Sequence, residues 1–394
     1  MTPTKNMGFV EFVAFTALMF ASVAYAIDSM LPLIVAMGED LSPDAVQRAQ
    51  LVITTFVFGL GLGTLFIGPV SDALGRRRVI VAGIVVYMLA ATLAALSTSM
   101  EMLLVARFLQ GLGVAAPRVV TQALVRDQYA GRVMARLMSF AMTLFVLVPA
   151  IAPLMGATLG ALFGWRAIFW SFLVFGTVSA LWLLLRQPET LPPEKRVPLR
   201  AGPVIHAFAE VFSNKQVMAY LSALTFSFAS MFVWLSTIAP IFEDVYDRGA
   251  SFPLWFALSA LLSAPGSLVN AQLVMRLGMR RLIFSALLAQ LSLIVTVAAL
   301  FWGGAPVPFW LFFVFMVGHF FTVGLIFGNL NALALEPLAG TASSVMGGVS
   351  TMVSAAIAAP IATLYNGTIA PLVAGVGLCA LMALASMLVA RRWD

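Results

Sequence analysis

One acidic residue, Asp28, lies deep inside an apolar segment of the chain, and Arg107 lies at a similar distance from the end of another such segment. A carboxyl group removed from water favours its protonated form, whereas a nearby arginine favours the ionised form. A change in the distance between the two groups would therefore bind and release a proton. The pair predicts proton coupling, with Asp28 as the protonation site and Arg107 as its partner. A permanent salt bridge that only fixes the fold is the alternative interpretation.

A second arginine, Arg118, follows Arg107 by three helical turns, so a helix would place both side chains on one face. An arginine within an apolar helix is costly unless it faces a partner or a wet cavity. The two guanidinium groups could therefore attract an anionic or carboxylate-bearing substrate. Two other interpretations stay open, because Arg118 could bind backbone carbonyls and the Arg107 side chain could reach the membrane surface.

Other polar and aromatic side chains within apolar segments could line a substrate cavity. His319 lies near the middle of one segment and could contact the substrate or titrate, and Asn329 follows it. An interhelical hydrogen bond is an equally good role for His319. Tyr25, Phe228 and Trp234 could form a wall for an apolar substrate, although most aromatic residues of this chain must simply pack or face lipid.

Metal and enzyme chemistry have little support in the sequence. Cys379 is the single cysteine, and the two histidines, His206 and His319, lie far apart without an acidic partner pattern. An integral-membrane enzyme would also need a nucleophile or paired carboxylates within the apolar segments. We expect no metal site and no cofactor, with a proton gradient as the energy source.

The composition requires a membrane. Of the 394 residues, 62% are hydrophobic and 10% are charged, and the mean hydropathy of +1.02 lies outside the range of soluble domains. Each apolar run must be a helix, because lipid satisfies no backbone polar group, and a span takes roughly 20 residues. The twelve predicted spans are 8–37, 48–70, 79–99, 101–124, 138–162, 165–186, 217–241, 252–275, 282–303, 308–334, 343–366 and 369–390.

The positive charge is distributed as in a membrane protein. The formal net charge is +6, but the basic residues form short clusters between apolar runs, which argues against nucleic-acid binding. Most of them fall in the loops on the side of the N-terminus, which predicts that both termini are cytoplasmic and that the protein crosses a membrane an even number of times. The first apolar run is too long for a cleaved secretory signal, so we expect it to be the first span.

A charged, proline-rich stretch divides the chain into two halves. We expect an N-terminal six-helix bundle over 1–186, a cytoplasmic linker over 187–215 and a C-terminal six-helix bundle over 216–394. The sequence "GPVSDALGRRRV" after the second span has a weaker echo in "NAQLVMRLGMRRLI" after the eighth, with Gly75 aligned on Gly278. Two similar halves in one orientation are typical of parallel-repeat transporters.

The loop after the second span resembles the signature loop of the major facilitator superfamily, in which it acts as a conformational latch. The matching residues here are Gly68, Asp72, Gly75, Arg76 and Arg77. Glycine residues allow two helices to approach closely and allow a tight turn. An aspartate can accept hydrogen bonds from an arginine or from a helix N-terminus. The alanine that follows the aspartate departs from the family, which often has a basic residue there. A plain cluster of positive charge would not explain the aspartate and the glycines.

Three further motifs resemble the same superfamily. Arg107-x-x-Gln110-Gly111 is similar to its second motif, which is tied to proton coupling. The Asp-x-x-Leu-Pro sequence that begins at Asp28 resembles the bicyclomycin-resistance (Bcr/CflA) group of drug:proton antiporters. The fifth span, "VPAIAPLMGATLG", resembles the antiporter motif of drug exporters, with alanines in place of two glycines. Its candidate residues are Pro149, Pro153 and Gly156, for which plain helix packing is the alternative.

The resemblance implies an all-α integral membrane protein with the major facilitator fold, in which twelve transmembrane helices form two six-helix bundles around a central cavity. It implies proton-coupled efflux of small organic molecules or drugs by alternating access. Proton-coupled uptake of a small carboxylate-bearing metabolite is the alternative, favoured by the paired arginines. The expected partners are the substrate, protons and the lipid bilayer, and the protein is expected to act as a monomer without nucleic acid.

Overall fold

A computed structural model describes residues 7–336 and 342–393. Over these residues the chain is helical without strands, and twelve segments are long and apolar enough to cross a membrane. The predicted fold class is confirmed by these segments. The fifth span differs most from its predicted bounds, since it runs over Gly131–Phe163 and so carries two arginines of the preceding loop within the helix.

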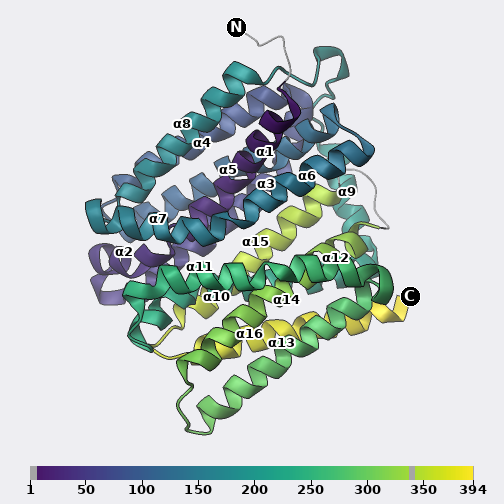
Figure 1. Cartoon of the computed structure of the whole chain (residues 1–394). Coiled ribbons are helices and arrows are strands. Elements are labelled where there is room, and N and C mark those ends of the chain that lie inside the picture. Colours follow the sequence, from purple (N-terminus) through teal and green to yellow (C-terminus); the bar gives the residue numbers. More distant parts are fainter. Residues whose placement is uncertain (1–6, 337–341, 394) are drawn as a thin grey trace.

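The described residues of the first half form eight α-helices (Figure 1). They are α1 (Phe9–Asp28), α2 (Ile34–Leu41), α3 (Leu51–Leu74), α4 (Arg76–Ala95), α5 (Met100–Gln128), α6 (Gly131–Val146), α7 (Val148–Phe163) and α8 (Ala167–Arg186). Two spans are interrupted near prolines, which lack the N–H that a helix needs. Pro32 follows the end of α1, and Pro149 lies at the junction of α6 and α7.

The second half of the described chain also contains eight α-helices, with its interruption in a different span. Its helices are α9 (Ala201–Ser213), α10 (Lys215–Asp244), α11 (Phe252–Ser263), α12 (Pro265–Leu277), α13 (Met279–Trp302), α14 (Phe309–Leu335), α15 (Ala342–Thr363) and α16 (Ala370–Ala390). Helix α9 lies within the linker and had no place in the predicted set of elements. It forms because its apolar residues Ala207 and Val211 share one buried face against the second half.

Glycines allow the spans of the first half to pack very closely. A Cβ at Gly59 would lie 2.1 Å from the Phe108 carbonyl oxygen, and one at Gly111 would lie 2.0 Å from that of Phe56. Helices α3 and α5 are therefore in backbone contact, and α4 packs on the other side of α5. Helix α5, which carries both candidate arginines, is held at the centre of its half.

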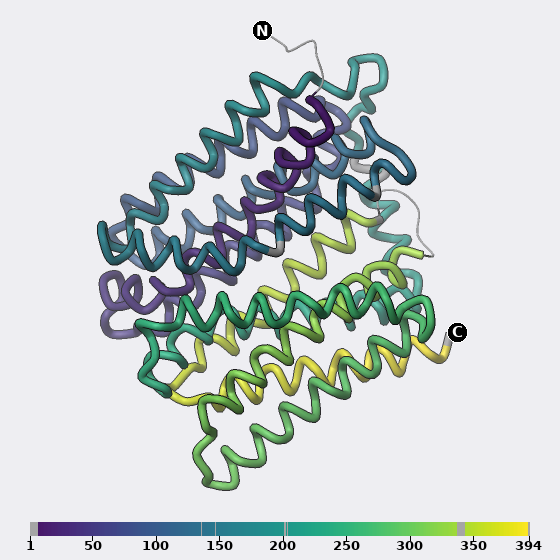
Figure 2. Tube along the Cα trace, viewed as in Figure 1, coloured from purple at the N-terminus to yellow at the C-terminus, as the bar shows by residue number. Residues whose placement is uncertain are grey.

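The two halves meet along a seam formed by α3 with α15 and by α7 with α11 (Figures 1 and 2). At Gly61 an added Cβ would lie 2.5 Å from the Met352 backbone nitrogen, so the backbones of α3 and α15 are in close contact there. Helices α7 and α11 lie side by side, whereas α6 and α12 diverge from there toward the side on which both chain ends lie. We call that side, which carries Arg76–Arg78 and the linker, the basic face.

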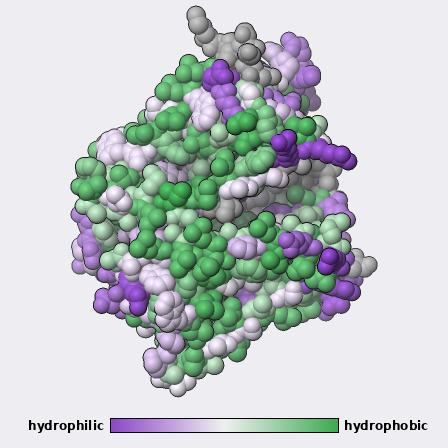
Figure 3. Space-filling model, viewed as in Figure 1, coloured by the Kyte–Doolittle hydropathy of each residue, from purple (hydrophilic) through white to green (hydrophobic). Residues whose placement is uncertain are grey.

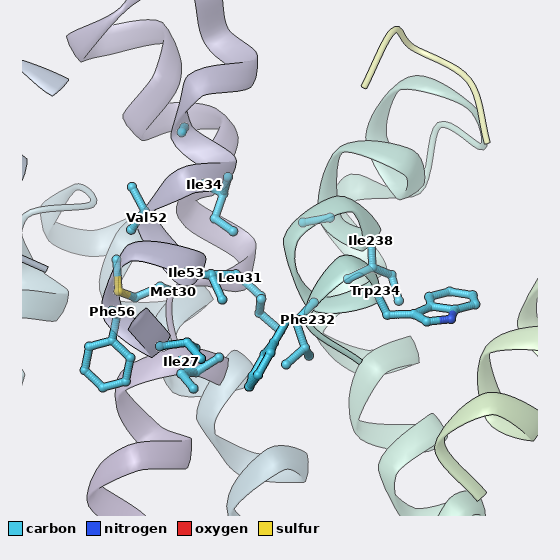
Figure 4. Packing of buried hydrophobic residues seen from close by; sticks show 14 of the residues in the cluster. Ile27, Met30, Leu31, Ile34, Val52, Ile53, Phe56, Phe232, Trp234 and Ile238 are labelled. Atoms are coloured by element: carbon cyan, nitrogen blue, oxygen red, sulfur yellow. The ribbon is translucent and has the colours of Figure 1, made fainter. Parts of the chain in front are cut away.

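Apolar side chains cover the middle of the molecule and also fill the seam. Figure 3 shows hydrophobic residues across the centre of the visible face, with hydrophilic ones toward its ends, as lipid contact requires. Figure 4 shows Phe232 of α10 pointing toward Ile27 and Leu31 of the other half. These residues belong to one buried cluster, so the halves are joined by an apolar contact in this conformation.

Candidate functional site

Arg107 is fully buried and joins three helices of the first half. Its Nε donates to the Val52 carbonyl oxygen at 3.2 Å, and its Nη2 donates to the Ala26 carbonyl oxygen at 3.0 Å. Its Nη1 donates to the side-chain oxygen of Gln110, and its guanidinium carbon lies 4.2 Å from the centre of the Phe56 ring. The charge is thus held by backbone and amide oxygens and by an aromatic face inside the bundle, and not by solvent.

The carbonyl of Ala26 is free to accept because α1 stops four residues before Pro32. The Met30 N–H donates to the Ile27 oxygen, three residues back, at 3.2 Å. In a continuous helix it would donate to the oxygen of Ala26. The proline ring cannot fit against an intact preceding turn, so the helix is broken there and Arg107 takes the vacated acceptor.

Asp28 is the last residue of α1 and is buried, with 6% of its surface exposed. Its carboxylate makes no ion pair or hydrogen bond with a described residue. Arg107 instead donates to the backbone oxygen of Ala26, two residues before Asp28 in α1. The expected ion pair between Asp28 and Arg107 is therefore absent in this conformation. The physical reason is that carbonyl and amide oxygens already occupy donors on all three guanidinium nitrogens.

Helix α7 packs directly against the break in α1. A Cβ at Gly156 would lie 1.8 Å from the Ser29 carbonyl oxygen, and one at Gly160 would lie 2.3 Å from a methyl carbon of Leu33. Any side chain at Gly156 would force the two segments apart. The proline- and glycine-rich span, which holds Pro149 and Pro153 as well, therefore contacts the residue next to Asp28.

Arg118 is partly buried in α5, and no hydrogen bond or ion pair joins its side chain to a described residue. The alternative role as a partner of backbone carbonyls thus has no contact to support it in this conformation. An unpaired guanidinium group is costly within a membrane-spanning helix. It leaves donors for water or for a group on a bound molecule.

Tyr25 lies inside the first half and does not face the seam. Its hydroxyl is 2.8 Å from the Ser171 hydroxyl, and its ring centre is 5.3 Å from that of Phe172 and 5.4 Å from that of Phe175. All three partners belong to α8. The prediction that Tyr25 lines the substrate cavity is not supported, because the rotation of α1 turns this side chain toward its own bundle.

Trp234 is placed in the same way within the second half. It is fully buried against α14, with its ring centre 4.9 Å from that of Phe315 and 5.6 Å from that of His319. Figure 4 shows Trp234 and Phe232 on opposite sides of α10, with Phe232 toward the first half. Phe232, which the sequence did not single out, is thus an aromatic residue at the seam, and Trp234 packs within its own half.

His319 and Asn329 make interhelical hydrogen bonds. The Gln290 amide nitrogen lies 2.5 Å from His319 Nδ1, which joins α13 to α14. The Asn329 amide donates to the Asn270 side-chain oxygen at 2.7 Å, which joins α14 to α12. These contacts match the alternative role given to His319 and leave the cavity role of both residues without support. Such bonds pair polar groups that lipid could not satisfy.

The loop after α3 is built as a junction of four helix ends. Gly75 has a φ of +100°, which suits glycine, and it separates α3 from α4. Arg76 pairs with Asp72 and also reaches Asp127, at the end of α5, at 3.3 Å. The Arg77 side chain donates to the backbone oxygen of Leu184, near the end of α8. Four spans are therefore tied together at the predicted latch.

The linker contributes a residue to this junction that the sequence did not reveal. The Glu189 carboxylate accepts from the backbone N–H of Arg76 at 2.9 Å and from that of Arg77 at 3.2 Å. The Val197 N–H donates to the Asp72 backbone oxygen at 3.1 Å. The first N–H groups of a helix that begins after Gly75 need an acceptor. Nothing in the sequence shows that Glu189, more than 100 residues further along the chain, supplies it.

At the seam, the same loop approaches the second half. A Cβ at Gly68 would lie 3.2 Å from the Ser344 hydroxyl of α15. The predicted latch thus touches both the linker and the opposite bundle. Within the described part of the chain, no group of three metal-binding side chains occurs.

The twelve membrane-spanning helices and the charged loop after α3 are typical of a membrane transporter. Comparison with known proteins gives the same class. The sequence pattern of the Major Facilitator Superfamily matches residues 13–359. The chain belongs to this superfamily and is a multi-pass membrane transporter rather than an enzyme. Its fold is similar to that of the human organic anion transporter MFSD10 (TETRAN), with a TM-score of 0.71, 17% identity and coverage of 98% of this chain and 100% of that one.

Two bacterial relatives are similar over most of their length. The bicyclomycin resistance protein homolog of Haemophilus influenzae is 30% identical, over 90% of this chain and 89% of that protein. Multidrug resistance protein D of Escherichia coli is 28% identical, over 84% of this chain and 86% of that protein. The predicted similarity to the bicyclomycin-resistance group is confirmed.

Proposed function

We propose that this protein exports small organic molecules, drugs among them, across the bacterial inner membrane in exchange for protons. Two of its relatives carry bicyclomycin and multidrug resistance in their names. The observation that carries the proton-coupling part is the isolated carboxyl group of Asp28, buried at the break in α1. An ionisable group in that setting changes its charge when the surrounding helices move.

The chemistry at the break follows from its neighbours. The Arg107 guanidinium group is bonded to the oxygen of Ala26, two residues from Asp28. A shift of the broken segment that brings the carboxylate to this charge would stabilise its ionised form. Protonation removes that stabilisation and lowers the cost of burying the carboxyl group. Because Gly156 of α7 contacts Ser29, a shift of the broken segment must move α7, which lies at the seam with α11. Proton binding and rocking of the halves are thereby linked.

We further infer the topology and assembly. Both termini are cytoplasmic, since the loops of the basic face carry most of the lysine and arginine residues. The functional halves are 1–186 and 216–394, with 187–215 as linker, and a single chain supplies both halves of the transport path. No cofactor takes part, and the proton gradient supplies the energy.

The experiment uses purified protein in liposomes with an imposed proton gradient and a pH dye inside. A panel of cationic, neutral and anionic drugs is added to wild type, Asp28→Asn and the control Asp44→Asn, which removes an exposed carboxylate in the loop before α3. We expect a transported drug to dissipate the gradient in wild type and control only. Coupling that persists in Asp28→Asn would overturn the proposal.

Uptake of a carboxylate-bearing metabolite by proton symport is the second candidate. The observation that favours it is the unpaired guanidinium group of Arg118 within α5. Direction separates the two candidates: export predicts that cells expressing the protein accumulate less drug, and uptake predicts that they accumulate more of an anionic solute. Arg118→Gln should weaken only the second activity.

A further inference from the structure

A pocket of about 670 Å³ opens beside the predicted latch on the basic face. It lies between the start of α4 and the end of α8 and is roofed by the linker. Three arginines, Arg77, Arg78 and Arg196, contribute to its wall together with apolar residues of both helices, among them Val81 and Leu184. The pocket is therefore cationic on the side of the loops and apolar on the side of the membrane.

The positive charge in this pocket is not neutralised by its lining. Glu189 is the one acidic residue among the lining side chains, and its carboxylate already accepts backbone N–H groups of α4. Arg78 is exposed and makes no hydrogen bond or ion pair with a described residue. Arg77 is fixed by its bond to Leu184, and the Arg196 Nε donates to the Leu191 oxygen at 3.4 Å. The guanidinium group of Arg78 and the other N–H groups of Arg196 are thus available to an anion.

An exposed apolar surface continues from the pocket toward the middle of the membrane. On α4, Val85 and Leu89 follow Arg78 at helical spacing and are 47% and 67% exposed. On the adjacent α8, Leu181 and Leu185 are 51% and 68% exposed. Side chains of this kind on membrane-spanning helices contact acyl chains. A cationic pocket at the end of an apolar groove has the shape and chemistry of a phospholipid site.

We propose that this pocket binds the phosphate headgroup of an anionic phospholipid, with the acyl chains along the groove between α4 and α8. Basic pockets between transmembrane helices on the cytoplasmic side suit such headgroups, and arginine forms paired hydrogen bonds with phosphate. Because Arg77 and the linker both belong to the latch junction, a bound lipid holds the linker against α4. Anionic lipid therefore stabilises the conformation in which this junction is formed. The inference does not depend on which substrate is transported.

The test titrates the purified full-length protein in neutral detergent with phosphatidylglycerol and follows its thermal unfolding midpoint. The variant Arg78→Gln/Arg196→Gln removes two of the guanidinium groups and leaves the bonds of Arg77 intact. The matched control is Arg281→Gln, an exposed arginine at the corresponding position of α13, outside the pocket. Phosphatidylcholine and water-soluble glycerol phosphate are titrated in parallel.

We expect phosphatidylglycerol to raise the midpoint of wild type and control, with roughly 30-fold weaker apparent affinity in the double variant. Phosphatidylcholine should act equally and weakly on all three proteins. An equal response to phosphatidylglycerol in the double variant would overturn the site. A shift by glycerol phosphate at the same concentration would instead show a simple anion site and overturn the lipid assignment. The single variant Arg78→Gln replaces the double variant if the latter does not fold, and it should weaken the response in the same direction.

Discussion

Arg107 owes its position to backbone oxygens of two neighbouring helices. The break in α1 frees the oxygen of Ala26, and the oxygen of Val52, at the start of α3, accepts from Arg107 as well. Removing the Arg107 side chain leaves the buried Ala26 carbonyl without this donor, which costs more than the bond itself contributes. The residue is thus a structural anchor that joins α5 to α1 and α3.

We expect Arg107→Lys to lower the free energy of unfolding, although the positive charge is kept. A lysine donates from one nitrogen and cannot reach three acceptors on separate helices, and each lost partner costs about 1–3 kcal/mol. Thermal unfolding in detergent measures the change. The control is Arg48→Lys at an exposed pair with Glu101, where the loss should stay below about 1 kcal/mol. Equal effects at the two sites would contradict the anchoring role.

Helix α7 acts on the proton site through a glycine contact. We expect Gly156→Ala to destabilise the protein by about 1–3 kcal/mol, because the added methyl group would overlap the Ser29 carbonyl oxygen. Transport should fall at the same time, since α7 is pushed away from the break in α1. Gly328→Ala in α14 is the control, as an added Cβ there meets no atom within 4 Å. Stability and transport are measured on the same liposome preparation. If Gly156→Ala changes neither, close contact between α7 and Ser29 is not required.

The linker is held to the latch junction by Glu189. Replacing it by alanine removes the acceptor at the start of α4, so the linker should detach more often. We expect faster trypsin cleavage after Lys195, an exposed linker residue, in Glu189→Ala than in wild type. Glu194→Ala, which removes an exposed carboxylate of the same linker, serves as the control. If the two variants are cleaved at the same rate, Glu189 does not hold the linker.

The elements of this protein are largely predictable, because lipid forces each apolar run into a helix and loop charge orients it. The rotation of each helix about its own axis is not predictable in this way. Residues on all faces of α1 and α10 are apolar, so periodicity could not show that Tyr25 and Trp234 face their own bundles. The acceptors of Arg107 on other helices are backbone oxygens, and Glu189 lies in the linker, so neither contact leaves a sequence pattern. The third acceptor, Gln110, belongs to the Arg107-x-x-Gln110 motif.

The whole molecule is a pair of bundles with one titratable group at a break beside their seam. In this conformation the halves touch through Phe232 and the apolar residues of the broken segment. The proposed proton site, Asp28, is therefore one residue from a contact that must change if the halves rock. Under the proposed function, this placement would let the one carboxyl group couple proton movement to substrate movement.

The most direct measurement of this coupling is proton release from the purified protein in weakly buffered detergent solution when a transported drug is added. If the drug and the proton compete for the site, wild type releases protons in proportion to the bound drug, and Asp28→Asn binds the drug but releases none. Equal proton release from Asp28→Asn would contradict the assignment of Asp28 as the coupling residue.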